Sequence, residues 1–177
     1  MSYRRNRVAG GTYFFTVTLR NLSSDALVQH IGLLRDAFRS VRTERPFTID
    51  AIVILPEHLH IIWPLQEGEA DYSGCWRGIK SRFTHVLCST DVSLIRDNRG
   101  EYLLWQRRVR EHTIRDERDY AYHVAYCHWN PIKHGLVQCL ADWPHSSFHR
   151  YVHLGLLQLD WPGDFAEPED EYGESSV

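Results

Sequence analysis

Two apolar segments, residues 47–55 (FTIDAIVIL) and 58–65 (HLHIIWPL), are separated by a single Pro-Glu dipeptide. Both segments are rich in β-branched and aromatic residues, which favour strands. A connection of two residues allows an antiparallel hairpin and excludes a parallel crossover, which needs a dozen residues or more. Pro-Glu is not a preferred two-residue hairpin turn. We nevertheless expect a hairpin, with His58 and His60 on its second strand.

Other elements are predicted on both sides of this hairpin. Strand-forming residues gather over residues 12–20 and again within 102–112. Apolar residues recur at helical spacing over residues 25–42 and 74–88, which indicates two amphipathic helices.

A third helix is predicted after Asp116, which is a good N-cap residue. We expect it to end at Asn130, since the residue before a proline is disfavoured in the helical region. The order is then β-α-β-β-α-β followed by a helix. This is the α+β, ferredoxin-like split βαβ pattern, an antiparallel sheet with helices on one face, here with a C-terminal helix and tail.

The composition is that of an ordinary globular protein, with 177 residues, 43% hydrophobic and 24% charged. No apolar run approaches the ~20 residues of a membrane span, and the N-terminal residues lack the apolar core of a signal peptide. The four cysteines form no CxxC pair, which is typical of reduced thiols. A single cytoplasmic domain is expected.

The net charge of −3 conceals an uneven distribution. Residues 160–177 contain seven acidic residues and no Lys or Arg, which leaves 20 basic and 16 acidic residues in the first 159. A mildly basic body with an acidic tail suggests a polyanionic partner, although a solvated mixed surface would have the same composition. We expect the tail to be disordered and to compete with such a partner for the basic body.

The His-x-His pair carries the first chemical signal. Alternation along a strand puts His58 and His60 on one face, with Leu59 on the other. Two imidazoles at this separation suit a divalent cation, with a third ligand supplied from elsewhere. The pair is also compatible with two rings at a strand edge, because the chain contains 11 histidines.

A second signal lies in the third helix. Tyr122, Tyr126 and Asn130 are spaced by four residues and would form one stripe on the helix surface. Tyrosines at such spacing are often core residues with a solvated hydroxyl. The spacing alone leaves packing and chemistry open.

The motifs together resemble a known family. LPEHLHIIW (55–63) resembles the HUH signature of single-strand DNA endonucleases. YHVAYCHWNPIKHGLV (122–137) and ADWPHSSFHRY (141–151) resemble the REP-associated tyrosine transposases, which are related to the single-tyrosine insertion-sequence transposases. The likeness extends over most of the chain, but residues 89–101 and the residues after Asp164 have no counterpart.

The resemblance implies residue roles. His58 and His60 would bind a divalent metal, Mg²⁺ or Mn²⁺, with Asn130 as third ligand in a place where related transposases have glutamine. Tyr126 would be the nucleophile that forms a 5′-phosphotyrosine, with Tyr120 and Tyr122 as rival tyrosines. The implied activity is an endonuclease and strand transferase for single-stranded or hairpin DNA at repetitive extragenic palindromes.

The implied DNA partner also suggests candidate contacts. Basic and aromatic residues near the motifs are the candidates for binding nucleic acid: Arg4, Arg5, Arg7, Arg107, Arg108, His112, Arg115, Lys133, His134, Trp143 and Arg150. For Trp143 and Arg150, as for Phe148, packing of the C-terminal segment is equally expected. Arg77, Lys80 and Arg82 are expected to be solvated on the outer side of their helix.

This organisation predicts one domain, residues 1–159, with the tyrosine helix at about 116–130 and a DNA-contacting segment at about 136–159. A monomer is expected, although loop lengths leave open whether the tyrosine serves its own chain. Two other functions remain compatible with the sequence: a hairpin-binding protein without cleavage activity, and a zinc hydrolase, which the absence of HExxH disfavours.

Overall fold

The structure is a computed structural model that describes residues 9–90 and 92–163. It contains a four-stranded antiparallel sheet in the order β2-β3-β1-β4. The strands are β1 (Thr12–Thr18), β2 (Ala51–Ile54), β3 (His58–Pro64) and β4 (Arg110–Thr113). This confirms the predicted α+β class and the predicted hairpin, in which β2 pairs with β3.

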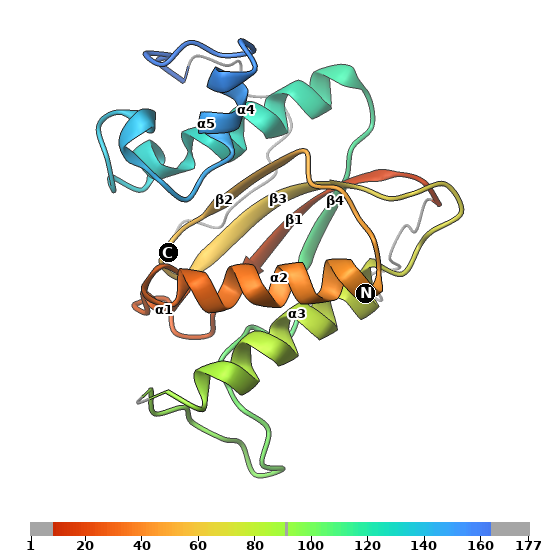
Figure 1. The fold of residues 1–177 in the computed structure, drawn as a ribbon, viewed down its shortest axis with the longest axis vertical. Helices are drawn as coiled ribbons and strands as arrows, with labels where there is room; N and C mark the ends of the chain where they lie inside the picture. Colours follow the sequence, from red (N-terminus) through yellow and green to blue (C-terminus); the bar gives the residue numbers. More distant parts are fainter. Residues whose placement is uncertain (1–8, 91, 164–177) are drawn as a thin grey trace, which may run out of the picture.

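The helices divide between the two faces of the sheet (Figure 1). The pair α2 (Ile31–Glu44) and α3 (Tyr72–Leu87) covers one face, and α4 (Glu117–Lys133) with α5 (Phe148–His153) lies over the other. Two short elements complete the set, α1 (Ala26–Gln29) and the 3₁₀ helix η1 (Leu140–Asp142).

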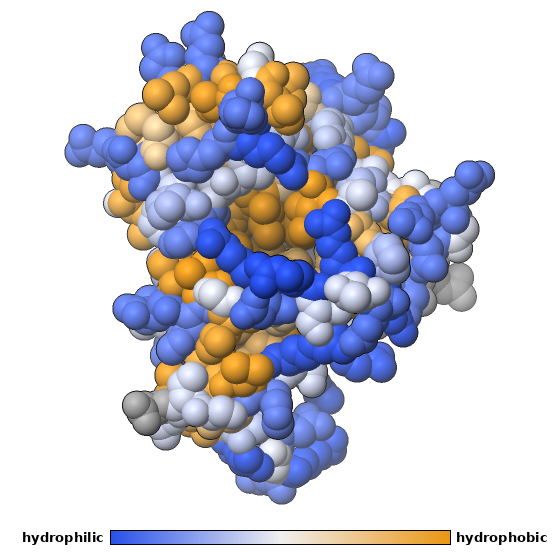
Figure 2. Space-filling view, viewed as in Figure 1, coloured by the Kyte–Doolittle hydropathy of each residue, from blue (hydrophilic) through white to orange (hydrophobic). Residues whose placement is uncertain are grey.

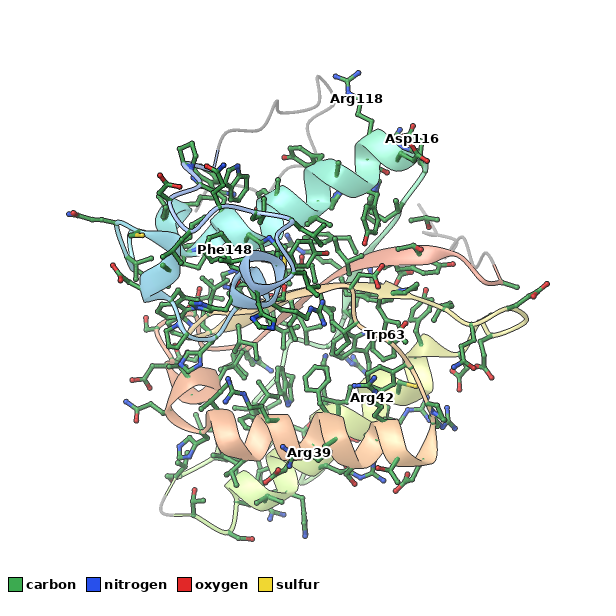
Figure 3. The ribbon with its side chains drawn as sticks, turned by 45° about the horizontal axis from the view of Figure 1, so that its top comes forward. Arg39, Arg42, Trp63, Asp116, Arg118 and Phe148 are labelled. Carbon is green, nitrogen blue, oxygen red and sulfur yellow. The ribbon has the colours of Figure 1, made fainter. Side chains whose placement is uncertain are left out.

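The larger core lies between the sheet and the pair α2 and α3. Alternate residues of β1 and β3, among them Phe15 and Trp63, face this side and pack against Trp76 of α3. Figure 3 shows Trp63 between the sheet and α2. The two helices approach closely at Gly78, where an added Cβ would lie 3.1 Å from a methyl group of Val41. A side chain there would push α3 away from α2.

The second core lies under α4. It contains Phe14 of β1, Val53 of β2, Ile62 of β3 and Cys127 of α4, all of which are buried. The chain after α4 also packs on this side, because Ser147 exchanges hydrogen bonds with Ile52 through its backbone and side chain. The C-terminal segment therefore lies along β2 and fixes α4 over the sheet.

Several predicted boundaries were wrong. The helix expected over 25–42 is divided at His30, whose backbone leaves the helical region (φ −113°, ψ 36°). The strand expected within 102–112 starts only at Arg110, since the preceding residues form isolated bridges instead of a ladder.

The end of the third helix was also predicted wrongly. α4 continues through Pro131 to Lys133. Pro131 lacks an N–H, which removes one hydrogen bond in the last turns, and its side chain is buried. The last turn brings Lys133 and His134 to the site described below.

Within the described residues, no helix is long and apolar enough to cross a membrane. Figure 2 shows an apolar patch at the top of the molecule, over the chain after α5, where Leu154, Leu156 and Leu159 are exposed. All four cysteines are free thiols. The acidic tail from Asp164 onward and the N-terminal Arg4, Arg5 and Arg7 lie outside the described residues.

Candidate active site

The two histidines of β3 lie side by side on the face covered by α4. Their ring centroids are 4.9 Å apart, and His58 and His60 are 6% and 1% exposed. β3 is an inner strand, and His60 pairs with Thr16 of β1 across the ladder. Leu59 points to the opposite core. The alternation predicted from the sequence is confirmed.

One nitrogen of each imidazole is held by a neighbouring oxygen atom. His60 Nδ1 lies 2.9 Å from Thr16 Oγ1, and His58 Nδ1 lies 2.8 Å from a carboxylate oxygen of Glu57. His58 Nε2 is buried and makes no hydrogen bond to any described residue. Metal-binding histidines characteristically use one nitrogen for such an orienting contact and the other for the cation.

α4 brings Tyr126 to this pair within the same chain. Its ring centroid lies 5.5 Å from that of His60 and 6.0 Å from that of Phe14. Asn130, one turn later, is fully buried and donates from Nδ2 to the Tyr126 carbonyl at 3.0 Å. Its Oδ1 accepts no hydrogen bond from the described residues. A buried amide oxygen in that state can serve as a third ligand.

The last turn of α4 adds positive charge. Lys133 Nζ donates a hydrogen bond to the Tyr126 hydroxyl at 2.8 Å and lies 4.7 Å from the ring centroid. The His134 ring lies 5.0 Å from that of His58. Both residues were predicted as DNA contacts, and the structure places both beside the histidine pair and Tyr126.

The electrostatic environment favours a neutral His60. Burial, followed by electrostatic interactions with His58, His134 and Lys133, lowers the pKa of His60 well below its ordinary value, against a smaller opposite effect of Asn130. A neutral imidazole is the form that binds a metal. For Glu57, burial acts to raise the pKa, but the hydrogen bond and charge of His58 outweigh it, so the pKa is lowered. A carboxylate therefore orients His58.

The rival tyrosines have other surroundings. The Tyr120 hydroxyl donates to Asp50 Oδ2 at 2.9 Å, and burial together with this hydrogen bond raises the pKa of Tyr120. Tyr122 stacks on Tyr126 with ring centroids 6.0 Å apart. Tyr126 is the tyrosine whose hydroxyl is bonded to Lys133 and whose ring contacts His60.

The remaining predicted DNA contacts lie further from this centre. Arg107, Arg108 and Arg115 are exposed around β4, at one edge of the sheet. On the other side, Trp143 donates to the Ile54 carbonyl at 3.0 Å and Arg150 donates to the Ile49 and Asp50 carbonyls. The two side chains fasten the C-terminal segment to β2 and to the residues just before it, and Phe148 is fully buried (Figure 3).

The structure reveals a second cluster that sequence analysis did not identify. His112 of β4 lies 2.8 Å from Asp119 of α4, and His123 lies 3.0 Å from the other oxygen of that carboxylate. Ligand atoms of the three residues all lie within 4.8 Å of one another, so the cluster could hold a metal ion. However, Asp119 Oδ2 already accepts hydrogen bonds from His112 and from the Arg115 backbone, and His123 Nδ1 donates to the Asp119 carbonyl at 2.8 Å. The cluster joins β4 to the start of α4.

Imidazole nitrogens and amide or carboxylate oxygens are suitable ligands for a divalent metal. The two clusters differ in whether these atoms already have hydrogen-bond partners. In the cluster of His112, Asp119 and His123, the residues satisfy one another. In the β3 site, an imidazole nitrogen of His58 and an amide oxygen of Asn130 are buried without such partners. Glu57 and Thr16, which orient the two histidines, were missed. Because Glu57 precedes His58 in the sequence, it could have been predicted to contact that histidine. Thr16 could not have been predicted, because only the strand register places it beside His60.

No family model matches this sequence. A REP-associated tyrosine transposase of Escherichia coli is 47% identical over 165 residues, covering 93% of each chain. A relative from Haemophilus influenzae, provisionally assigned to the same group, is 39% identical over 166 residues, covering 92% of this chain and 94% of the relative. A solved REP-associated tyrosine transposase bound to a REP hairpin superposes with a TM-score of 0.83 at 46% identity, covering 96% of this chain and 95% of the other.

Proposed function

Because the chain belongs to the REP-associated tyrosine transposases, a family of enzymes, we propose that it nicks and rejoins hairpin or single-stranded DNA through Tyr126. One observation carries the assignment of the nucleophile. The Tyr126 hydroxyl accepts a hydrogen bond from Lys133 at 2.8 Å, and its ring lies beside His60. The phenolic oxygen of Tyr126, the ammonium group of Lys133 and the histidine pair thus lie together within one chain.

The proposed reaction is a phosphoryl transfer to tyrosine. Tyr126 Oη attacks the scissile phosphorus, and the bond between phosphorus and the 3′ oxygen breaks. The phenolic proton that Tyr126 loses is balanced by the proton that the leaving 3′ oxygen gains. The products are a 5′-phosphotyrosine and a free 3′-OH. Since the phosphotyrosyl ester retains the energy of the broken linkage, attack by another 3′-OH rejoins strands without ATP. The enzyme would be a strand transferase as well as a nickase.

The surrounding residues support this chemistry in different ways. Lys133 stabilises the negative charge that develops on Tyr126 Oη. His58, His60 and Asn130 would hold Mg²⁺ or Mn²⁺, through Nε2 of each imidazole and Oδ1 of the Asn130 amide. Bound there, the cation would offset charge on a non-bridging phosphate oxygen. Glu57 and Thr16 keep the two imidazoles in the orientation required.

We also propose the substrate and the organisation of the chain. A relative that is 46% identical was solved with a REP hairpin, which supports repetitive extragenic palindromes as the DNA. Residues 1–159 would act as one monomeric unit in the cytoplasm, with the acidic residues 160–177 as an appendage. Arg107, Arg108 and Arg115, at the β4 edge, are proposed phosphate contacts.

The test is covalent capture. A labelled hairpin oligonucleotide is incubated with wild type and with Tyr126→Phe in Mg²⁺ or Mn²⁺, and the products are separated on a denaturing gel and analysed by mass spectrometry. We expect an adduct on the peptide that contains Tyr126, and none in the variant. Tyr122→Phe is the matched control and should retain the adduct. An adduct on Tyr122, or one that survives in Tyr126→Phe, would overturn the assignment. Hairpin binding with no adduct in any variant would identify a DNA-binding protein without cleavage activity.

A further inference from the structure

Lysine is rare in this chain, and arginine supplies almost all of its positive charge. Of the 20 basic residues, only Lys80 and Lys133 are lysine. Lys133 donates to the Tyr126 hydroxyl in the active site. Lys80 lies on α3, in the layer that covers the opposite face of the sheet (Figure 1). An arginine side chain stays charged at physiological pH, whereas a lysine amine can lose its proton and then act as a nucleophile.

Lys80 lines a cavity of about 660 Å³ between α3 and the chain that leads into β4. We expected this side chain to be solvated on the outer side of its helix, and the prediction was wrong. Lys80 is half-buried, and its Nζ donates to the Gln106 carbonyl at 2.9 Å and lies 5.6 Å from the ring centroid of Trp105. The indole is itself fixed, because its Nε1 donates to Thr84 Oγ1 at 3.1 Å. The amine is therefore held at one position in the cavity.

The surroundings of Lys80 favour the neutral amine. Burial lowers the pKa of Lys80 to about 8, from an ordinary value of 10.5. At pH 8, about half of the molecules then carry an unprotonated amine, compared with fewer than about one in a hundred for a solvated lysine. The hydrogen bond to the Gln106 carbonyl uses one N–H and leaves the nitrogen lone pair available. A desolvated, unprotonated lysine is the form that attacks a carbonyl carbon.

A cation that suits a phosphate group lies one turn before Lys80. Arg77 precedes Lys80 by three residues on α3, so the two side chains are neighbours on the helix surface. Both line the cavity, and Arg77 is exposed. A guanidinium group binds phosphate oxygens through paired N–H groups. The cavity thus combines a nucleophilic amine with a phosphate-binding cation.

The cavity also offers a hydrogen-bond donor. Trp76 is 2% exposed and lines the cavity, and its buried Nε1 has no acceptor among the described residues. A buried indole N–H usually has a partner. An oxygen atom of a small ligand would provide one.

We propose that Lys80 is an acylation site for small acyl phosphates, with Arg77 holding the phosphate while the amine attacks the carbonyl carbon. The bond between the carbonyl carbon and the phosphate oxygen breaks, inorganic phosphate leaves with the electron pair, and the amine releases one proton. The product is a neutral amide, whose N–H can still donate to the Gln106 carbonyl. Acylation therefore removes a positive charge from this face of the molecule. The reaction involves no DNA, so the inference is independent of the proposed function.

The experiment compares two acylating reagents. Wild type is incubated at pH 8 with acetyl phosphate or with the N-hydroxysuccinimide ester of acetic acid, which carries no phosphate. Modified lysines are identified by peptide mass spectrometry, with Lys80→Arg to confirm the assignment. Acetyl phosphate should modify Lys80 in the folded chain about tenfold faster than in the chain unfolded in guanidinium chloride, because more of the amine is unprotonated.

Arg77→Ala separates recognition of the phosphate from reactivity of the amine. This variant should react with acetyl phosphate about tenfold more slowly, as expected for loss of a charged hydrogen bond, and with the neutral ester at the wild-type rate. Arg39→Ala removes an equal charge from an exposed position on α2 and should alter neither rate. Inorganic phosphate should protect Lys80 from acetyl phosphate and not from the neutral ester.

Equal rates in the folded and unfolded chains would overturn the proposal. An effect of Arg77→Ala that is the same for both reagents, or absent for both, would also overturn it. If Arg77→Ala is unfolded by circular dichroism, protection by inorganic phosphate decides, and its absence would refute the phosphate site. Failure of the proposed function has a different signature, namely the absence of a DNA adduct on Tyr126.

Discussion

Lys133 Nζ donates a hydrogen bond to the hydroxyl of Tyr126 at 2.8 Å, across two turns of the same helix. The contact exists because α4 continues through Pro131 to Lys133. A helix that ended at Asn130 would leave the lysine in a connecting segment. The ammonium is thereby placed where negative charge develops when the phenolic oxygen becomes a nucleophile.

Replacement of this ammonium should slow chemistry more than binding. Lys133→Met should reduce the single-turnover rate of DNA cleavage roughly 10- to 100-fold, as expected for loss of a charged hydrogen bond. Rates are measured with saturating protein and a labelled hairpin. Lys133→Arg should retain part of the activity. Arg118→Ala, on an exposed side chain at the start of α4, is the control and should cleave normally (Figure 3). A normal rate in Lys133→Met would refute the role.

The metal should bind at the β3 histidines and not at the other cluster. His60→Gln should abolish Mn²⁺ binding measured by calorimetry or by electron paramagnetic resonance of the free ion, because one of two imidazole ligands is lost. Asp119→Asn removes the carboxylate of the other cluster and should leave Mn²⁺ affinity unchanged. The reverse result would move the metal to His112, Asp119 and His123.

Orientation of His58 by Glu57 should contribute to metal affinity. Glu57→Gln removes the carboxylate that lies 2.8 Å from His58 Nδ1 and should weaken Mn²⁺ binding about 10- to 100-fold. Glu67→Gln changes an exposed acid in the loop after β3 and has the same effect on net charge. If both variants weaken binding equally, the effect is one of overall charge and not of histidine orientation.

The junction of β4 and α4 should be sensitive to acid. Burial acts to raise the pKa of Asp119, but hydrogen bonds from His112 and the Arg115 backbone outweigh it and lower the pKa below its ordinary value of 3.8. Because the folded state has the lower pKa, the stabilisation is complete above about 3.8 and is lost as the pH falls through the folded-state value.

Asp119→Asn should therefore reduce the free energy of unfolding at pH 7 by roughly 1–3 kcal/mol, the cost of breaking a buried charged hydrogen-bond set. Its difference from wild type should shrink as the pH falls below about 3.8. Urea unfolding at several pH values measures both quantities. Glu117→Gln, an exposed acid in the first turn of α4, should show a much smaller change. A constant difference across the pH range would contradict the assigned cause.

Local sequence patterns were enough to predict most helices and strands, and to predict the histidine pair and the tyrosine stripe of the candidate active site. Strand alternation was enough to place His58 and His60 on one face, and helical spacing was enough to align Tyr122, Tyr126 and Asn130. Periodicity is a property of neighbouring residues, so it is visible in sequence. Helix ends were less accessible, as His30 and Pro131 illustrate, because cap geometry and packing decide between near-equal alternatives.

The sequence by itself determined the antiparallel hairpin, the one-sided histidine pair and the tyrosine stripe, since each depends on spacing along one segment. Only the tertiary structure decided that α4 covers the histidines within the same chain, that Thr16 orients His60, and that a cavity with Trp105 and Lys80 lies on the opposite face. Those contacts join residues from separate elements. They depend on strand order and on which face each helix covers, and no local pattern encodes either.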